Sequence, residues 1–178
     1  MDSFIKKVLL DLKNQNFDFS QSIFILPNKR SGFHLKKTLS EVISKTIFSP
    51  EIVSIENFIE ELSELKLLSN TELIFEFYSI YLNITPNDKQ EKFEDFIKWS
   101  RILIQDFNII DKEIEDPSQV FDYLKAVKEM DHWSLDSNPT ELVKRHLYFW
   151  SNIKSYYTEF SNHLLNINYG YQGILEKK

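Results

Sequence analysis

Two adjacent cations, Lys29 and Arg30, follow a short apolar run that ends at Pro27. A helical pattern begins near Ser31, so the two cations lie beside the exposed backbone amides of a helix start. A loop at the carboxyl end of a parallel strand is where open α/β sheets bind ligands. Cations and helix-start amides suit a phosphate group. Together with Asn28 they form the candidate binding site; the alternative is a solvated loop whose cations pair with nearby acids.

The motifs of ATP hydrolysis and of nuclease chemistry are missing. ATP hydrolysis needs a glycine-rich phosphate loop, G-x-x-x-x-G-K-[ST], yet Gly32 is the sole glycine before Gly170 and no Asp–Glu pair closes an apolar strand. A nuclease needs carboxylates and a lysine around a metal ion. Glu51 followed by Glu64 and Lys66 imitates that pattern, but positions i and i+2 of a helix point apart. We therefore expect this chain alone to be no enzyme and to need no cofactor.

Other polar and aromatic residues give weaker signals. The four histidines show no metal-ligand spacing, which predicts core or surface roles. Tryptophans can stack on bases, but helical spacing in a Phe-rich region predicts core positions for Trp99, Trp133 and Trp150. The acidic segments 56–64 and 111–116 are predicted to be solvated faces, which would repel DNA.

Composition indicates a folded, mainly helical chain. Its 178 residues are 42% hydrophobic and 15% aromatic, with 3 Gly and 5 Pro. Zero Cys excludes disulfides and thiol chemistry and suits a cytoplasmic location. A net charge of -6 speaks against a general nucleic-acid coat protein. No apolar run approaches the roughly 20 residues that span a bilayer, and the N-terminus does not read as a signal peptide, so no membrane partner is expected.

Hydrophobic periodicity predicts two strand–helix units in the first part of the chain. The helix 31–44 is predicted to place Phe33, Leu35 and Leu39 on one side. Successive strand–helix units imply a right-handed crossover and a small parallel sheet. The expected elements are helix 3–14, strand 22–26, helix 31–44, a brief strand 46–48, strand 51–55 and helix 56–65.

After residue 68 the pattern becomes helical. Ser69-x-x-Glu72 predicts a capping box, and Asp116–Pro117 predicts an N-cap followed by proline at the first helical position. The tail 168–178, NYGYQGILEKK, has no obvious core partner. We expect helices at 69–83, 89–108 and 116–130, a loop at 131–138, and a last helix from Pro139.

These elements predict an α/β fold that is predominantly helical. A small α/β part at 1–68 precedes an all-helical part at 69–178, although the two could form one compact domain.

The stretch Ser22–Leu39, with ILPNKRSGFHLKKTL, resembles the segment after the first helix in AddB-type helicase–nuclease subunits. In that family a strand ends in proline and is followed by a basic loop and a helix. The stretch is also similar to motif Ia of superfamily 1 helicases. Asn28 and Lys29 match that motif, whereas Arg30 and Ser31 stand where small residues are usual.

The next unit and the helical region extend the resemblance. In IVSIENF, Ser54 and Phe58 fit loosely where these helicases place a strand followed by a Thr–Phe–His or Ser–Phe pattern, but the histidine is missing. Residues 99–111, HWSL at 132–135 and GYQG at 170–173 resemble the N-terminal region of long proteins of the PD-(D/E)XK nuclease family.

The resemblance implies an N-terminal fragment of a DNA-repair helicase–nuclease, with a helicase 1A-like sheet edge and a helical 1B-like insertion. Its motor would be inactive, and the parent protein would be an exonuclease. The module would guide single-stranded DNA and support the remaining domains or a partner subunit. Lys29 and Arg30 would contact phosphates, Asn28 would shape the loop, and Ser54 and Asn57 would add polar contacts at the next strand end.

The competing interpretation is a protein–protein interaction module that binds no nucleic acid. In it, the aromatic-rich helices of 89–165 dock a partner, which the acidic net charge favours. A positive groove around Lys29, Arg30, Lys36 and Lys37 would favour DNA, and an exposed apolar patch would favour a protein partner.

Overall fold

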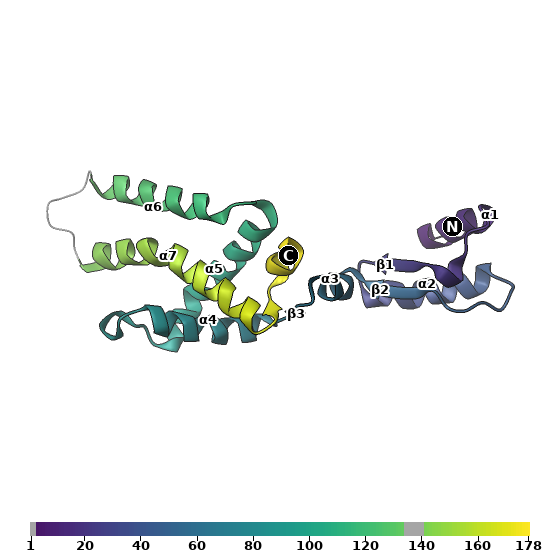
Figure 1. Ribbon diagram of the computed structural model, residues 1–178, viewed down its shortest axis with the longest axis horizontal. Coiled ribbons are helices and arrows are strands. Elements are labelled where there is room, and N and C mark those ends of the chain that lie inside the picture. Colours follow the sequence, from purple (N-terminus) through teal and green to yellow (C-terminus); the bar gives the residue numbers. More distant parts are fainter. Residues whose placement is uncertain (1–2, 134–140) are drawn as a thin grey trace. The chain divides into compact units, whose positions relative to one another are not determined.

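The computed structural model describes residues 3–133 and 141–178, and the chain divides between Leu62 and Ser63 into two compact units (Figure 1). The predicted class, predominantly helical α/β with a small parallel sheet, is confirmed. Residues 63–68, placed in the first part from sequence, belong to the second unit, where 66–67 pair with 169–170. No helix of the described residues is long and apolar enough to cross a membrane.

The first unit is built on one parallel strand pair. β1 and β2 align from Ile23 opposite Glu51 to Leu26 opposite Ser54. The strand predicted at 46–48 is wrong, because no neighbouring strand pairs with those residues. The elements are α1 (Phe4–Asn14), a 3₁₀ turn (Phe19–Gln21), β1 (Ile23–Leu26), α2 (Lys29–Val42), β2 (Glu51–Ser54) and α3 (Ile55–Ser63).

The core of the first unit lies where α1 and α2 cover one face of this sheet. Phe24 and Leu26 of β1 pack against the cluster, since alternate strand residues share a face. Phe33, which the sequence placed with Leu35, is instead 77% exposed. Two residues along a helix turn the side chain by about 200°, so the two cannot share a face. The buried cluster comprises Leu9, Phe19, Leu35, Leu39 and Val42.

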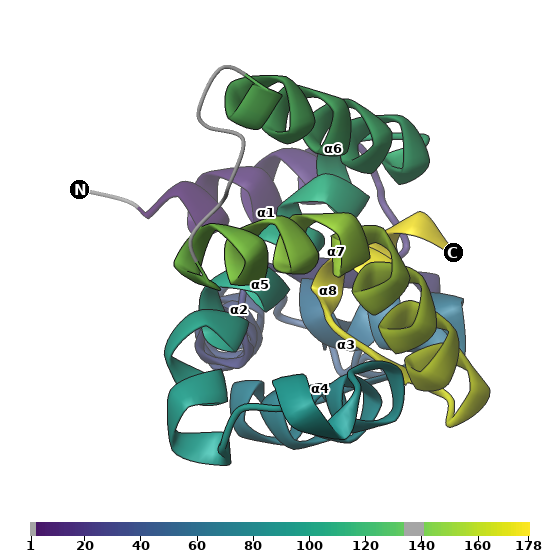
Figure 2. The ribbon, with the colours of Figure 1, turned by 90° about the vertical axis from the view of Figure 1, so that its left-hand side faces the viewer.

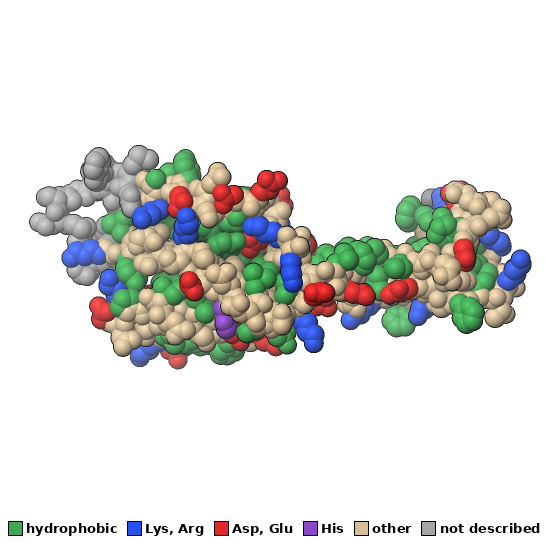
Figure 3. Space-filling model, viewed as in Figure 1, with side chains coloured by type: hydrophobic (Ala, Val, Ile, Leu, Met, Phe, Trp, Pro, Cys, Tyr) green, Lys and Arg blue, Asp and Glu red, His purple; other side chains and the backbone are tan. Residues whose placement is uncertain are grey.

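The other face of β1 remains exposed. Ile23 and Ile25 are 56% and 43% exposed and alternate with the core-facing residues. Ile55 and Leu62 of α3 are also exposed, although the apolar periodicity of 56–65 predicts an inward position for Leu62. Figure 3 shows hydrophobic side chains gathered over the region of α3 and β1.

The second unit is a helical assembly in which α7 lies between α6 and α4 (Figures 1 and 2). Residues 131–133, predicted to be a loop, extend α6, whereas 134–138 and Pro139 lie outside the described residues. The elements are β3 (Lys66–Leu67), α4 (Asn70–Ile84), a 3₁₀ turn (Asn87–Lys89), α5 (Phe93–Glu113), α6 (Pro117–Trp133), α7 (Glu141–Asn166), β4 (Tyr169–Gly170) and α8 (Gln172–Lys177).

Both predicted helix starts are confirmed. The Ser69 hydroxyl accepts a hydrogen bond from the Glu72 amide at 3.4 Å, and the Glu72 carboxylate accepts one from the Ser69 amide at 2.8 Å. At the start of α6, the Asp116 carboxylate accepts from the Ser118 amide at 3.1 Å. Each bond satisfies an amide that has no partner within its own helix.

Aromatic rings build the core of the second unit around Phe77. This side chain is fully buried on α4. Its ring centroid lies 4.9 Å from that of Phe160, 5.4 Å from Phe96 and 6.0 Å from Phe107. Tilted and edge-to-face pairs at these separations are favourable beyond the area that they bury. Much of the aromatic content therefore serves packing within this unit.

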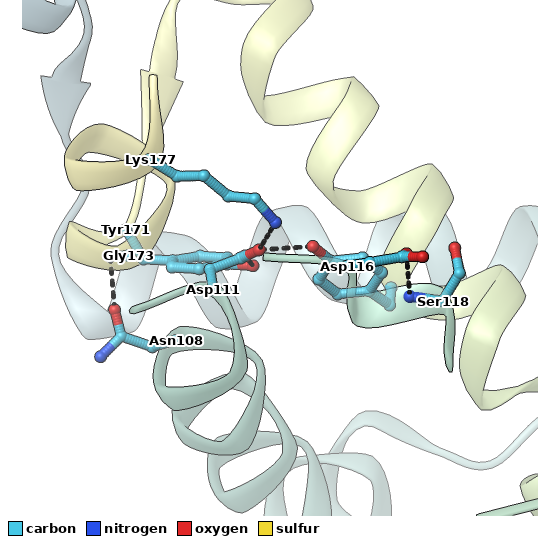
Figure 4. Close-up of polar contacts among 8 residues, drawn as sticks. Asn108, Asp111, Asp116, Ser118, Tyr171, Gly173 and Lys177 are labelled. Atoms are coloured by element: carbon cyan, nitrogen blue, oxygen red, sulfur yellow. Dashed lines mark hydrogen bonds and ion pairs between the residues drawn. The ribbon is translucent and has the colours of Figure 1, made fainter. Parts of the chain in front are cut away.

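The C-terminal segment packs on α5, so the prediction that it has no core partner is wrong (Figure 4). Tyr171, Ile174 and Leu175 are each at most 6% exposed. The Gly173 amide donates to the Asn108 side-chain oxygen at 2.7 Å. A Cβ at Gly173 would lie 2.5 Å from the Asn108 carbonyl oxygen, so glycine permits this close approach of α8 to α5.

Asp111 of α5 lies buried beside this contact (Figure 4). Its carboxylate accepts hydrogen bonds from the hydroxyls of Tyr157 and Tyr171, each at 2.5 Å, and its Oδ1 lies 3.2 Å from the Lys177 ammonium. Burial, reinforced by the Asp111 charge, raises the pKa of both tyrosines. The prediction that 111–116 is a solvated face is therefore wrong at Asp111.

Candidate nucleic-acid interface

A cleft of about 270 Å³ lies in the first unit at the carboxyl ends of β1 and β2 and the first turns of α2 and α3. Four of the five predicted site residues line it: Asn28, Lys29, Ser54 and Asn57. Parallel strands end at the same edge of their sheet, which brings together residues that are 25 to 29 positions apart in the sequence.

Asn28 and Ser54 hold the two helix starts. The Asn28 side-chain oxygen accepts from the Ser31 amide at 2.9 Å and from the Ser31 hydroxyl at 3.0 Å. The hydroxyl of Ser54, a buried residue, accepts from the Asn57 amide at 3.3 Å. These bonds fix the backbone on both sides of the cleft. The side-chain oxygens of both residues are thus already engaged, whereas Lys29 and Asn57 are exposed.

One stripe of α2 borders the cleft. Lys29, Phe33 and Lys36 occupy positions i, i+4 and i+7 and all contribute to its lining. Arg30 is not among the lining residues, because one step along a helix turns its side chain by about 100° from Lys29. Arg30 therefore lies beside the cleft. The second cation that lines the cleft with Lys29 is Lys36 and not Arg30.

Gly32 lets the start of α2 lie close to β2. It is buried, and a Cβ there would meet the Ile52 side chain at 3.1 Å. This contact is tighter than most that real Cβ atoms make. This approach places Lys29 and Phe33 of the stripe beside the end of β2.

The cations around the cleft are not neutralised by nearby acids. Across the described residues, Lys29, Arg30, Lys36 and Lys37 take part in no ion pair. Residues 1–62 contain eight Lys and Arg and eight Asp and Glu, so the net charge of -6 belongs to residues 63–178. The first unit therefore lacks the overall negative charge that would repel a polyanion, and its cations concentrate in 29–37.

Lys36 was expected beside a basic groove, whereas Phe33 was not predicted to line a binding site. Their signal was the spacing of four and seven residues from Lys29, which places all three on one helical face. Phe33 was instead assigned to the core because it is apolar. An apolar residue two positions from Leu35 cannot share its face.

None of the described tryptophan and histidine side chains is among the residues that line this cleft. Trp99 is half-buried, packs edge-on against Phe77 and donates to the Glu91 carboxylate at 2.9 Å. His34 is exposed, and His163 lies 2.6 Å from the Glu76 carboxylate. The described residues contain no group of three His, Asp or Glu that could hold a metal ion. The side chains of Trp133, His132 and His146 lie outside the description.

A second cleft, of about 480 Å³, lies in the second unit between α4, α5 and α7. Several of its polar groups are paired with one another. Glu91 accepts from Trp99, the Lys89 ammonium lies 4.0 Å from the Tyr148 ring centroid, and Tyr156 hydrogen-bonds to Thr85 at 2.9 Å. Burial raises the pKa of Tyr156 to about 12. This cleft carries both acidic and basic side chains and favours no single ligand charge.

Comparisons with known proteins found no relative of this chain. The chain matches no protein-family model, no curated protein and no solved structure.

Proposed function

We propose that the chain is a non-catalytic module that binds and guides single-stranded DNA within an AddB-like, PD-(D/E)XK-family DNA-repair helicase–nuclease. The observation that carries the proposal is the stripe of Lys29, Phe33 and Lys36 along a cleft at the carboxyl ends of two parallel strands. The proposed partners are single-stranded DNA and the remaining domains or a partner subunit, in the cytoplasm.

Phosphate is the group that this cleft suits best. The first amides of a helix have no partner within the helix, and Asn28 satisfies only that of Ser31. The amides of Lys29 and Arg30 therefore face the approach to α2 together with two ammonium groups and a guanidinium. Phosphate oxygens accept hydrogen bonds from both kinds of donor and prefer helix starts.

The charge distribution limits where DNA would bind. The acids of α3, including Glu56 in its first turn, are not among the residues that line the cleft. The excess of acids in residues 63–178 would repel phosphates from the second unit. A strand would therefore follow the α2 side of the cleft, with Arg30 and Lys37 as outer contacts.

A salt series with a labelled single-stranded oligonucleotide tests this proposal. Fluorescence anisotropy would compare the intact chain with Lys29→Gln, Arg30→Gln and Lys36→Gln. Each lost phosphate contact should reduce affinity and lower the slope of log affinity against log salt by about 0.7. The matched control is Lys45→Gln, an exposed lysine beyond the C-terminal end of α2. Absence of binding at low salt, or equal effects of all four variants, would refute the proposal.

A protein-docking module is the second candidate, and the exposed face of β1 favours it. Parallel strands are usually covered on both faces, whereas Ile23 and Ile25 are exposed. The aromatic helices favour docking less, because Phe96, Phe107 and Phe160 are fully buried. Self-association that Ile25→Lys abolishes, in a chain that binds no DNA, would support this candidate.

A further inference from the structure

We infer that Phe33 is a stacking platform for an unpaired nucleobase. The cleft would then bind a single strand through one of its bases as well as through its phosphates. This inference rests on the proposed function and adds a specific contact to it. It concerns a side chain that the fold does not use for packing.

The exposure of Phe33 is the first observation. Its side chain is 77% exposed although Leu35 and Leu39, on the other side of the same helix, are at most 7% exposed. Among the described residues no aromatic ring pairs with Phe33, whereas Phe19, Phe24 and Phe17 of the same unit form ring pairs. A ring with this exposure is accessible for stacking.

The position of Phe33 between two cations is the second observation. Along α2, Phe33 lies about 6 Å from Lys29 and Lys36 lies about 10 Å from Lys29, at a rise of 1.5 Å per residue. All three line the same cleft. Proteins that bind single strands combine a basic groove for the backbone with an aromatic ring for the bases. Lys29 and Lys36 would hold phosphates while a base lies on the ring between them.

Exposure alone does not single out this ring. Phe48 is 87% exposed, but it precedes β2 at the opposite end of the strands and does not line the cleft. Phe4 on α1 is 80% exposed and also lies outside the lining. Of these three exposed rings, Phe33 alone lies in the cleft that two lysines border.

The ligand that tests the inference is a pair of oligonucleotides of equal length, one of thymidines and one of abasic sites. Both present the same phosphates, and only the first presents bases. The intact 178-residue chain should bind the thymidine strand more tightly, by roughly 5- to 150-fold for one stacked base. A duplex of the same length should bind less tightly, because its bases are already stacked on one another.

Three variants identify the residue. Phe33→Ala should weaken binding of the thymidine strand by a factor in that range, with unchanged affinity for the abasic strand and an unchanged salt slope. Phe33→Trp should keep the preference and add an indole whose fluorescence the thymidine strand, but not the abasic strand, changes beyond the wild-type signal. Phe48→Ala is the matched control and should behave as wild type. Circular dichroism would verify that each variant is folded.

The outcomes separate this inference from the proposed function. Salt-dependent binding that requires Lys29 and Lys36 but is equal for both strands, or is unaffected by Phe33→Ala, would overturn the stacking role and leave the phosphate site. Failure to bind either strand would overturn both proposals. Weakened thymidine binding in Phe33→Ala together with an unchanged abasic affinity would establish the stacking contact.

Discussion

Removing the hydroxyl of Tyr171 tests whether the buried carboxylate of Asp111 holds the C-terminal helix in place. Tyr171 is 3% exposed, and its hydroxyl donates to the Asp111 carboxylate at 2.5 Å. Tyr171→Phe keeps the ring, which stacks on Phe160 at 6.2 Å, and removes the hydroxyl that makes this bond. A hydrogen bond to a charged group contributes about 1.5–3 kcal/mol. We expect the free energy of unfolding of the second unit to fall by that amount.

Tryptophan fluorescence during urea unfolding measures this change. All three tryptophans lie in residues 63–178, so their signal reports on the second unit and not on the first. Tyr123→Phe is the control, because Tyr123 is 70% exposed and surface changes usually stay within about 0.5 kcal/mol.

A double-mutant cycle makes the test specific. In an Asp111→Ala background the Tyr171 hydroxyl is buried without this acceptor, so its removal should cost almost nothing or should stabilise the unit. An equal loss of stability for Tyr171→Phe in that background and in the wild type would contradict the coupling between the two side chains. A loss for the single change that stays within the error of Tyr123→Phe would contradict it as well.

Three further predictions concern the same unit. Gly173→Ala places a Cβ 2.5 Å from the Asn108 carbonyl oxygen, and the resulting overpacking should cost about 1–3 kcal/mol in urea unfolding; a wild-type midpoint would contradict the close approach of α8 to α5. Phe77→Ala should lower the free energy of unfolding by about 3–5 kcal/mol. Phe75→Ala should lower it much less, because the Phe75 ring on the same helix is 55% exposed; equal losses would contradict a core centred on Phe77. Because the pKa of Tyr156 is raised to about 12 and that of Tyr171 is also raised, the folded chain keeps protons that the unfolded chain loses above pH ~10. Stability should therefore fall as the pH rises above 10, measured by circular dichroism in urea, and a stability that rises there would contradict the buried hydroxyls.

Local signals in the sequence determined much of the secondary structure. Ser69 with Glu72, and Asp116 with Pro117, start helices because a side chain and an amide three or fewer residues apart satisfy each other. The strand that ends at Pro27 and the one at 51–55 predicted a parallel pair, since each is followed by a helix. These relations need only neighbouring residues.

Part of the candidate site could also be predicted from the sequence. Asn28, Lys29, Ser54 and Asn57 meet because parallel strands end at one edge. The spacing of Phe33 from Lys29 is also visible in the sequence, but the apolar character of Phe33 predicts a core position that its helical phase does not allow. Helical phase separates Phe33 from Arg30, but which side of α2 lines the cleft depends on how α2 packs against β2.

Only the tertiary structure decided which residues of the second unit carry its polar core. Asp111 stands in an acidic run that looks solvated, and its burial depends on Tyr157, Tyr171 and Lys177, between 46 and 66 residues away. Gly173 acquires its role from Asn108, 65 residues earlier. Periodicity describes one helix at a time, whereas hydrogen-bond partners and close contacts arise when distant helices pack together.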